Sequence, residues 1–149
     1  MNMNKTLFTV AAVTFSVFLL SCSSPKENKT LSESDIPPGH AQIVGVVSKI
    51  EPVSDDASQT GPCSKAPCVA LVKVTSAVYG ASFPQLVINK DIRVKFNFTL
   101  EKTTKDLFPN MKEEYPGLRE GQEFTALVSH VETMDETAPQ FQIYAYETN

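Results

Sequence analysis

The sequence is poor in the residues from which active sites are usually built. Its 149 residues include no tryptophan, two histidines and three cysteines. It contains neither a G-x-S-x-G nucleophile motif nor an H-E-x-x-H metal motif, and no pattern in it holds two carboxylates at a catalytic separation. We therefore expect a protein without catalytic residues, without a metal and without a cofactor.

Positive charge and long apolar runs are also scarce. Thirteen Lys and Arg against 17 Asp and Glu give a formal net charge of −4, which disfavours nucleic acid and anionic lipid as partners. The one long uncharged, mostly apolar run is the fourteen residues from Leu7 to Leu20. This run is shorter than the ~20 residues needed to cross a bilayer. Lys5 precedes it, as a basic residue precedes the apolar core of an export signal.

The run closes on Leu19-Leu20-Ser21-Cys22, which resembles the lipobox of bacterial lipoproteins. The resemblance implies that residues 1–21 are a signal peptide removed before Cys22. It also implies that Cys22 carries the acyl chains that hold the protein on a membrane of the bacterial cell envelope. Ser23 is similar to the residue at this position in outer-membrane-directed lipoproteins, so we expect the outer membrane. The alternatives are an ordinary secretory signal or an uncleaved anchor.

Residues 22–40 are polar and contain Pro25, Pro37 and Pro38. Such a stretch buries too little apolar surface to fold by itself. We expect it to be a flexible tether between the lipid anchor and a single domain of residues 41–149, since a chain of this length suffices for one core.

The domain is expected to be all-β, because no stretch shows a sustained helical period. The clearest strand is Ile92–Leu100, where apolar and polar residues alternate strictly, as in a strand with one wet face. Gly45 interrupts the first β-rich segment and predicts a bulge or bend there. The five predicted strands are Ile43–Val47, Val69–Val78, Ile92–Leu100, Phe124–Val128 and Phe141–Tyr146.

Two other segments have weaker patterns. Leu86–Ile88 predicts either a short extra strand or the start of the third strand. Asn110–Glu114 predicts one or two helical turns, since Pro109 prevents a longer helix.

Five strands, with the helix-compatible segment between the third and fourth, are typical of an OB-like barrel. The alternative is a small β-sandwich, which normally has about seven strands. The apolar faces of the five strands are expected to form the core, which would consist of Val44, Val46, Val72, Val74, Ile92, Val94, Phe96, Phe98, Phe124, Ala126, Val128, Phe141 and Ile143.

Two segments, Cys68–Val74 and Val94–Leu100, are similar to netrin-like domains, which have the same barrel. The chain lacks the Cys-x-Cys start and the several disulfides of the inhibitory members. The resemblance therefore implies the fold, and it leaves protease inhibition as a further alternative for the function.

The exported domain has two cysteines, Cys63 and Cys68, and an even pair in such a domain indicates a disulfide. We expect this disulfide to close the polar loop between the first two strands. The alternative is a thiol-redox or metal-handling pair, for which His40, His130 and Met134 are the available further ligands. The C-x4-C spacing differs from the C-x-x-C of thiol oxidoreductases.

OB-like barrels bind ligands on the face of strands two and three, flanked by the first and last connecting loops. These loops are residues 51–67 and 132–139, and both are acidic. An acidic rim suits a cation or a basic envelope protein, whereas the simpler interpretation is two solvated loops. The candidate binding residues are Glu51, Asp55, Asp56, Glu132, Asp135 and Glu136.

The polar face of the third strand is a second candidate surface. It begins at Arg93 and continues through Lys95, Asn97 and Thr99. The pattern is equally typical of a binding strip and of a plain solvent-facing side. Together, these features predict a lipid-anchored, non-enzymatic binding or adaptor module of the cell envelope.

The lipobox generates the first testable prediction. Mass spectrometry of the protein extracted from membranes of its native host should detect an N-terminal peptide that begins at Cys22 and carries acyl chains. The same preparation of a Cys22→Ser variant should give no acylated peptide. A soluble, unmodified product that starts at another residue would contradict the prediction.

Overall fold

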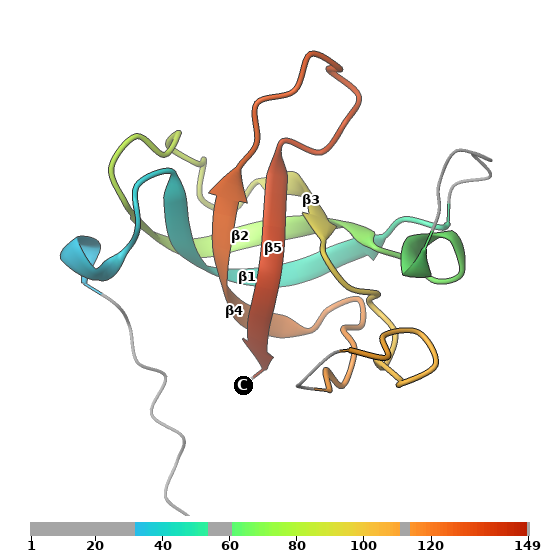
Figure 1. The fold of residues 1–149 in the computed structure, drawn as a ribbon. Coiled ribbons are helices and arrows are strands. Elements are labelled where there is room, and N and C mark those ends of the chain that lie inside the picture. Colours follow the sequence, from blue (N-terminus) through green and yellow to red (C-terminus); the bar gives the residue numbers. More distant parts are fainter. Residues whose placement is uncertain (1–31, 54–60, 111–113, 149) are drawn as a thin grey trace, which may run out of the picture.

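A computed structural model describes residues 32–53, 61–110 and 114–148, and it is all-β (Figure 1). Within these residues no helix is long and apolar enough to cross a membrane. The only helical elements there are the short 3-10 turns η1 (Glu33–Asp35) and η2 (Pro62–Ser64). The strands are β1 (His40–Ile50), β2 (Val69–Tyr79), β3 (Asp91–Phe96), β4 (Glu123–His130) and β5 (Phe141–Thr148).

The five strands form a closed barrel in the order β1-β2-β3-β5-β4, with β4 pairing back onto β1. Four of the pairings are antiparallel, and β3 with β5 is parallel. The predicted five-stranded OB-like barrel is therefore confirmed. The sandwich alternative is wrong, because one sheet closes on itself.

Gly45 lets β1 bend at the place where the sequence predicts it. The pairing of β1 with β2 shifts register between Val44 and Gly45. A Cβ atom at Gly45 would lie 2.6 Å from Cγ1 of Val72, which is closer than atoms in proteins approach one another. The absence of a side chain thus allows the two strands to approach inside the barrel.

The predicted inward face of β1 is wrong. Ile43 and Val47 are fully buried, whereas Val44 and Val46 are half-buried on the outer face of the barrel. Within the predicted strand Ile43–Val47 both faces are apolar, so that segment alone does not indicate its orientation. The polar residues His40 and Gln42 share the outer face with Val44, but they lie before the predicted strand.

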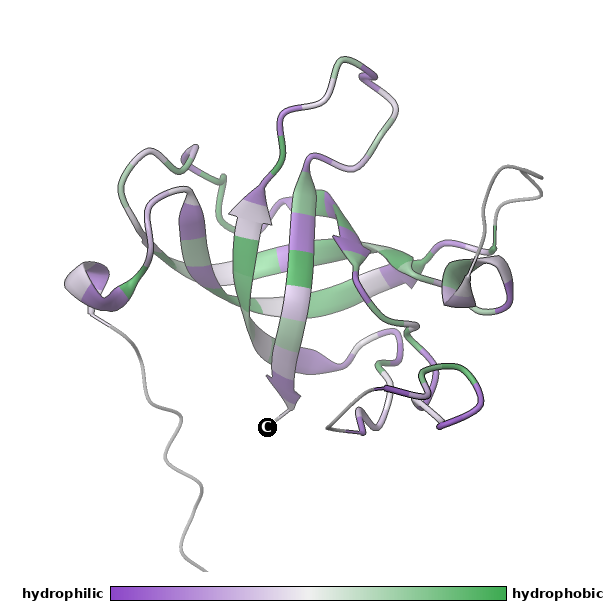
Figure 2. Ribbon diagram, viewed as in Figure 1, coloured by the Kyte–Doolittle hydropathy of each residue, from purple (hydrophilic) through white to green (hydrophobic). Residues whose placement is uncertain are grey.

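The other strands contribute the core that their alternation predicts, and Figure 2 shows hydrophobic residues along the strands. Phe96 lies at the centre, with ring centroids 5.7 Å from Phe98 and 6.0 Å from Phe124. Ile92 and Phe141 are partly buried and pack against this core. The predicted residues that are buried are Val72, Val74, Val94, Phe96, Phe98, Phe124, Ala126, Val128 and Ile143.

β3 ends at Phe96, four residues before its predicted end at Leu100. The chain bends after Phe96, and the N–H of Leu100 donates to the carbonyl of Pro67. Thr99, predicted on the polar face, is completely buried, and its hydroxyl donates to the carbonyl of Glu101 at 3.5 Å. Phe98 and Leu100 are thus buried as the alternation predicts, although the strand has ended, and Thr99 is the exception.

Two weaker predictions have different outcomes. Leu86–Ile88 is part of the loop between β2 and β3 and is not a strand. Of the predicted helical turns at 110–114, residues 111–113 lie outside the described residues, and Asn110 and Glu114 are not helical.

The N-terminal boundary of the packed region lies before residue 41. Ile36 is 5% exposed, and the N–H of Gly39 donates to the carbonyl of Ala81 at 2.7 Å. Residues 36–39 therefore pack against the barrel, whereas residues 32–35 are exposed. Residues 22–31 of the predicted tether lie outside the described residues.

The central position of Phe96 predicts a large stability difference between adjacent residues of β3. Phe96→Ala should lower the free energy of unfolding by about 3–5 kcal/mol, because it removes a buried ring and leaves a cavity. Lys95→Ala, on the exposed side of the same strand, should change it by about 0.5 kcal/mol or less. Urea denaturation measures both, and equal losses would mean that the two faces of β3 are wrongly assigned.

Candidate functional site

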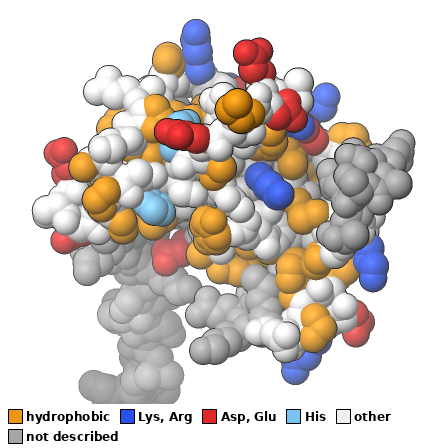
Figure 3. All heavy atoms as spheres, turned by 45° about the horizontal axis from the view of Figure 1, so that its top comes forward, with side chains coloured by type: hydrophobic (Ala, Val, Ile, Leu, Met, Phe, Trp, Pro, Cys, Tyr) orange, Lys and Arg blue, Asp and Glu red, His pale blue; other side chains and the backbone are white. Residues whose placement is uncertain are grey.

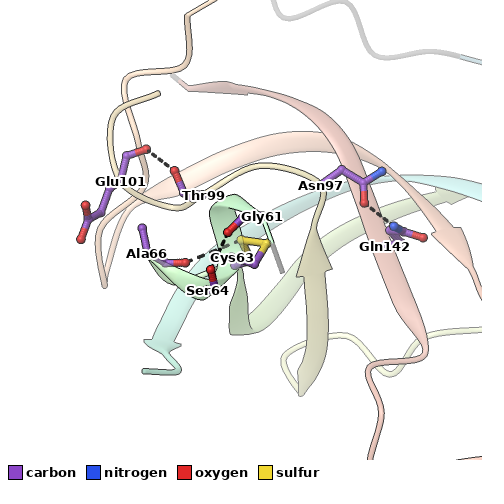
Figure 4. The surroundings of a disulfide bond; sticks show 9 residues. Gly61, Cys63, Ser64, Ala66, Asn97, Thr99, Glu101 and Gln142 are labelled. Carbon is purple, nitrogen blue, oxygen red and sulfur yellow. Dashed lines mark hydrogen bonds between the residues drawn. A yellow bond between two sulfur atoms is a disulfide. The ribbon is translucent and has the colours of Figure 1, made fainter. Parts of the chain in front are cut away.

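The two cysteines form the predicted disulfide (Figure 4). Cys63 lies in η2, and Cys68 directly precedes β2, where its carbonyl accepts the N–H of Phe96 at 2.8 Å. Cys68 is 5% exposed. The disulfide thus fixes the end of the loop between β1 and β2 to the first residues of the sheet.

The further ligands proposed for a metal-handling pair do not join the cysteines. His40 begins β1, whereas Cys68 lies beside the far end of that strand, where Ile50 pairs with Ala70. The ring of His130 packs near Phe83 and Phe141. In the part of the chain that the structure describes, no group of three His, Cys, Asp or Glu residues is placed to hold a metal ion.

Arg93 connects the two acidic loops. Its Nε and Nη2 donate to the two carboxylate oxygens of Glu51 at 2.7 and 2.6 Å, and its Nη1 donates to the carbonyl of Thr137. A guanidinium that binds a carboxylate through two parallel hydrogen bonds is held in one orientation. Arg93 therefore ties the start of the β1–β2 loop to the β4–β5 loop.

The acidic residues of these loops have partners within the protein. The hydrogen bond from Arg93 lowers the pKa of Glu51 below its usual value of 4.5, against a smaller opposing effect of burial. The carboxylate of Asp135 accepts two hydrogen bonds from Thr137, one from its hydroxyl at 2.6 Å and one from its N–H at 2.8 Å. These hydrogen bonds lower the pKa of Asp135. Both carboxylates thus stabilise loop structure.

The remaining predicted acidic residues contribute less to a site. Glu132 and Glu136 are exposed in the β4–β5 loop. Asp55 and Asp56 lie outside the described residues. The four described acidic side chains, Glu51, Glu132, Asp135 and Glu136, therefore do not form one cation-binding cluster.

A row of polar side chains crosses from β3 to β5 on the outer face of the barrel. We define the β3–β5 strip as Lys95, Asn97, Gln142 and Tyr144. The parallel pairing places Lys95 opposite Gln142. The amide of Gln142 donates to Oδ1 of Asn97 (Figure 4), and the hydroxyl of Tyr144 donates to Oε1 of Gln142 at 3.2 Å.

The hydrogen bonds within the strip leave mostly donors for a ligand. The side-chain carbonyls of Gln142 and Asn97 already accept hydrogen bonds, while the ammonium of Lys95 pairs with no carboxylate of the described residues. The ring of Tyr144 is 58% exposed and adds an aromatic face. Such a surface suits a ligand that presents carboxylate, carbonyl or hydroxyl oxygens.

Gln142 and Tyr144 were absent from the candidates drawn from the sequence. Their alternation with Phe141 and Ile143 predicts that they face away from the core. Their partners, however, lie on and just after β3, and Asn97 and Gln142 are 45 positions apart in the sequence. No local pattern identifies a partner at that separation.

Comparisons of the chain with protein-family models, with curated proteins and with solved structures return no match. The resemblances to lipoproteins and to netrin-like domains therefore rest on the sequence alone. The function is argued below from the sequence and from the geometry of the strip and the two loops.

The ion pair between Glu51 and Arg93 predicts a pH-dependent contribution to stability. Because the pKa of Glu51 is lower in the folded than in the unfolded chain, its contribution is present above about pH 4.5 and is lost as the pH falls through the lowered pKa. Glu51→Gln should lower the free energy of unfolding at pH 7 by about 1 kcal/mol or less, since the pair is partly exposed.

Urea denaturation of wild type and Glu51→Gln at pH 7 and at pH 3 measures this contribution. The difference between their free energies of unfolding should be smaller at pH 3 than at pH 7. Glu136→Gln is the matched control, because Glu136 is an exposed acid of the β4–β5 loop. A difference for Glu51→Gln that does not change with pH would contradict the role of the charged carboxylate.

Proposed function

We propose that the protein is a lipid-anchored, non-enzymatic binding or adaptor module of the bacterial cell envelope, located at the outer membrane. Cys22 would supply the anchor, and the β3–β5 strip would hold the ligand or the envelope partner. The observation that carries the binding part of this proposal is the strip itself, with oriented amides, an exposed tyrosine ring and the charge of Lys95, which pairs with no carboxylate of the described residues.

The packing of the barrel favours binding on its outer surface. Large side chains fill the interior, and Phe96, Phe98 and Phe124 are at most 1% exposed. The ligand must therefore contact the outside of the sheet. The groups available there are an ammonium, two amides and a phenol, which recognise a ligand through hydrogen bonds and stacking.

The ion pair between Arg93 and Glu51 also supports the assignment of the strip as the binding surface. Because Glu51 offsets the charge of Arg93, the neighbouring Lys95 supplies the positive charge that a ligand can use. A partner that presents a carboxylate or several carbonyl oxygens fits this arrangement better than the basic partner suggested by the acidic loops.

The burial of Cys68 argues against the thiol-redox alternative. Exchange of a disulfide requires that a thiolate reaches one of its sulfurs. Cys68 is 5% exposed, so attack would be restricted to the half-buried Cys63. No observation favours the netrin-like inhibitor over the binding module.

Site-specific photocrosslinking in the native envelope tests the proposal. A photoreactive phenylalanine analogue at position 144 should capture one reproducible partner, whereas the same analogue at Ser76, an exposed position on β2, should not. Adding Lys95→Ala should weaken binding about tenfold, since a hydrogen bond to a charged group contributes about 1.5–3 kcal/mol. Identical adducts at both positions, or no effect of Lys95→Ala, would contradict binding at the strip.

A further inference from the structure

Three segments that are distant in the sequence meet at one end of the barrel (Figure 1). We call this the tether end; it consists of residues 32–39, the β2–β3 loop (80–90) and the β4–β5 loop (131–140). The N–H of Gly39 donates to the carbonyl of Ala81, and its carbonyl accepts the N–H of His130. The N-terminal segment therefore lies between the roots of the two loops.

The packing beneath the tether end fixes the positions of these loops. Phe83 is 8% exposed, and its ring centroid lies 6.4 Å from that of His130 and 6.0 Å from that of Phe141. Gly80 lies so close to Pro37 that a Cβ atom there would be 2.4 Å from the Pro37 carbonyl oxygen. The loops are thus held by the barrel and present their outer side chains in defined positions.

The tether end carries most of the large hydrophobic side chains that are exposed in the described residues. Of the five large hydrophobic side chains that are exposed in the described residues, four belong to its two loops: Val87 at 58%, Ile88 at 41%, Val131 at 37% and Met134 at 103%. Single exposed hydrophobic residues are ordinary in soluble proteins, but a concentration at one end indicates contact with an apolar partner.

The position of the lipid anchor identifies that partner. Only nine residues, 23–31, lie between the acylated Cys22 of our proposal and Ser32, the first described residue, so Ser32 is ten residues along the chain from the anchor. A chain of ten residues spans at most about 35 Å. Because the described chain begins at the tether end, a segment of this reach allows this end to contact the membrane, and the exposed apolar side chains favour that orientation over others.

The charges at the tether end restrict the type of lipid. Figure 3, in which the top of Figure 1 comes forward, shows acidic side chains beside exposed hydrophobic ones. Glu132 and Glu136 are exposed on either side of Met134 in the sequence. These carboxylates are repelled by anionic headgroups, whereas zwitterionic headgroups carry ammonium groups that can pair with them.

We propose that the tether end rests on a zwitterionic lipid surface, with Val87, Ile88, Val131 and Met134 in contact with the headgroup region. This inference depends on the lipid anchor of the proposed function and goes beyond it, because an anchor alone leaves the barrel free to turn. The loop between β3 and β4, which lies on the other side of the barrel from the β4–β5 loop (Figure 1), then faces away from the membrane.

Single-tryptophan variants test the orientation, since the native chain has no tryptophan. Val87→Trp and Met134→Trp place the probe at the tether end, and Lys105→Trp, in the exposed β3–β4 loop, is the matched control. The full, lipidated protein is reconstituted in phosphatidylcholine–phosphatidylethanolamine vesicles with and without brominated acyl chains, which quench a nearby indole.

Brominated vesicles should reduce the fluorescence of Val87→Trp and Met134→Trp at least about twofold and leave that of Lys105→Trp almost unchanged, because only groups at the interface approach the acyl chains. Partial replacement by phosphatidylglycerol should weaken the quenching. Equal quenching at all three positions, or quenching confined to Lys105→Trp, would overturn the orientation while the anchor stands. Protein that does not float with the vesicles would overturn the anchor itself, and the docking with it.

Discussion

The parallel pairing of β3 with β5 is the contact on which the rest of the structure depends. It joins the antiparallel meander of β1, β2 and β3 to the antiparallel hairpin of β4 and β5, and the pairing of β4 with β1 then completes the barrel. On the inside it brings Phe96 beside Ile143, and on the outside it brings Lys95 beside Gln142. The same short pairing of three residues on each strand therefore supplies core residues on its inner face and residues of the candidate binding strip on its outer face.

The strand positions could be predicted where one face of a strand is polar. The alternation in β3 identifies Val94 and Phe96 as core residues. For the predicted part of β1, Ile43–Val47, the same reasoning fails because both faces are apolar, and the polar His40 and Gln42 that mark the outer face lie before it. The bend after Phe96 could not be predicted either, since it depends on contacts with other loops.

The candidate site was predicted in part, for a related reason. Residue type identifies Lys95 and Asn97 as polar and outward-facing, but their partners on β5 depend on the long-range closure of the barrel. The acidic loops illustrate the opposite case. Their composition suggests a cation site, yet Arg93 lies between them and neutralises Glu51. Composition identifies charged groups, whereas the fold determines which of them are free to bind a ligand.

The central claim is that the β3–β5 strip is a binding surface, and the side-chain amides of Asn97 and Gln142 report on it directly. NMR spectra of the lipidated protein in detergent micelles can be recorded before and after addition of a solubilised envelope fraction from the native host. The account predicts that these two amide signals shift or broaden, together with the backbone signals of Lys95 and Tyr144, while those of Ser76 do not. Unchanged strip signals, with perturbations confined to the acidic loops or to the disulfide, would contradict it.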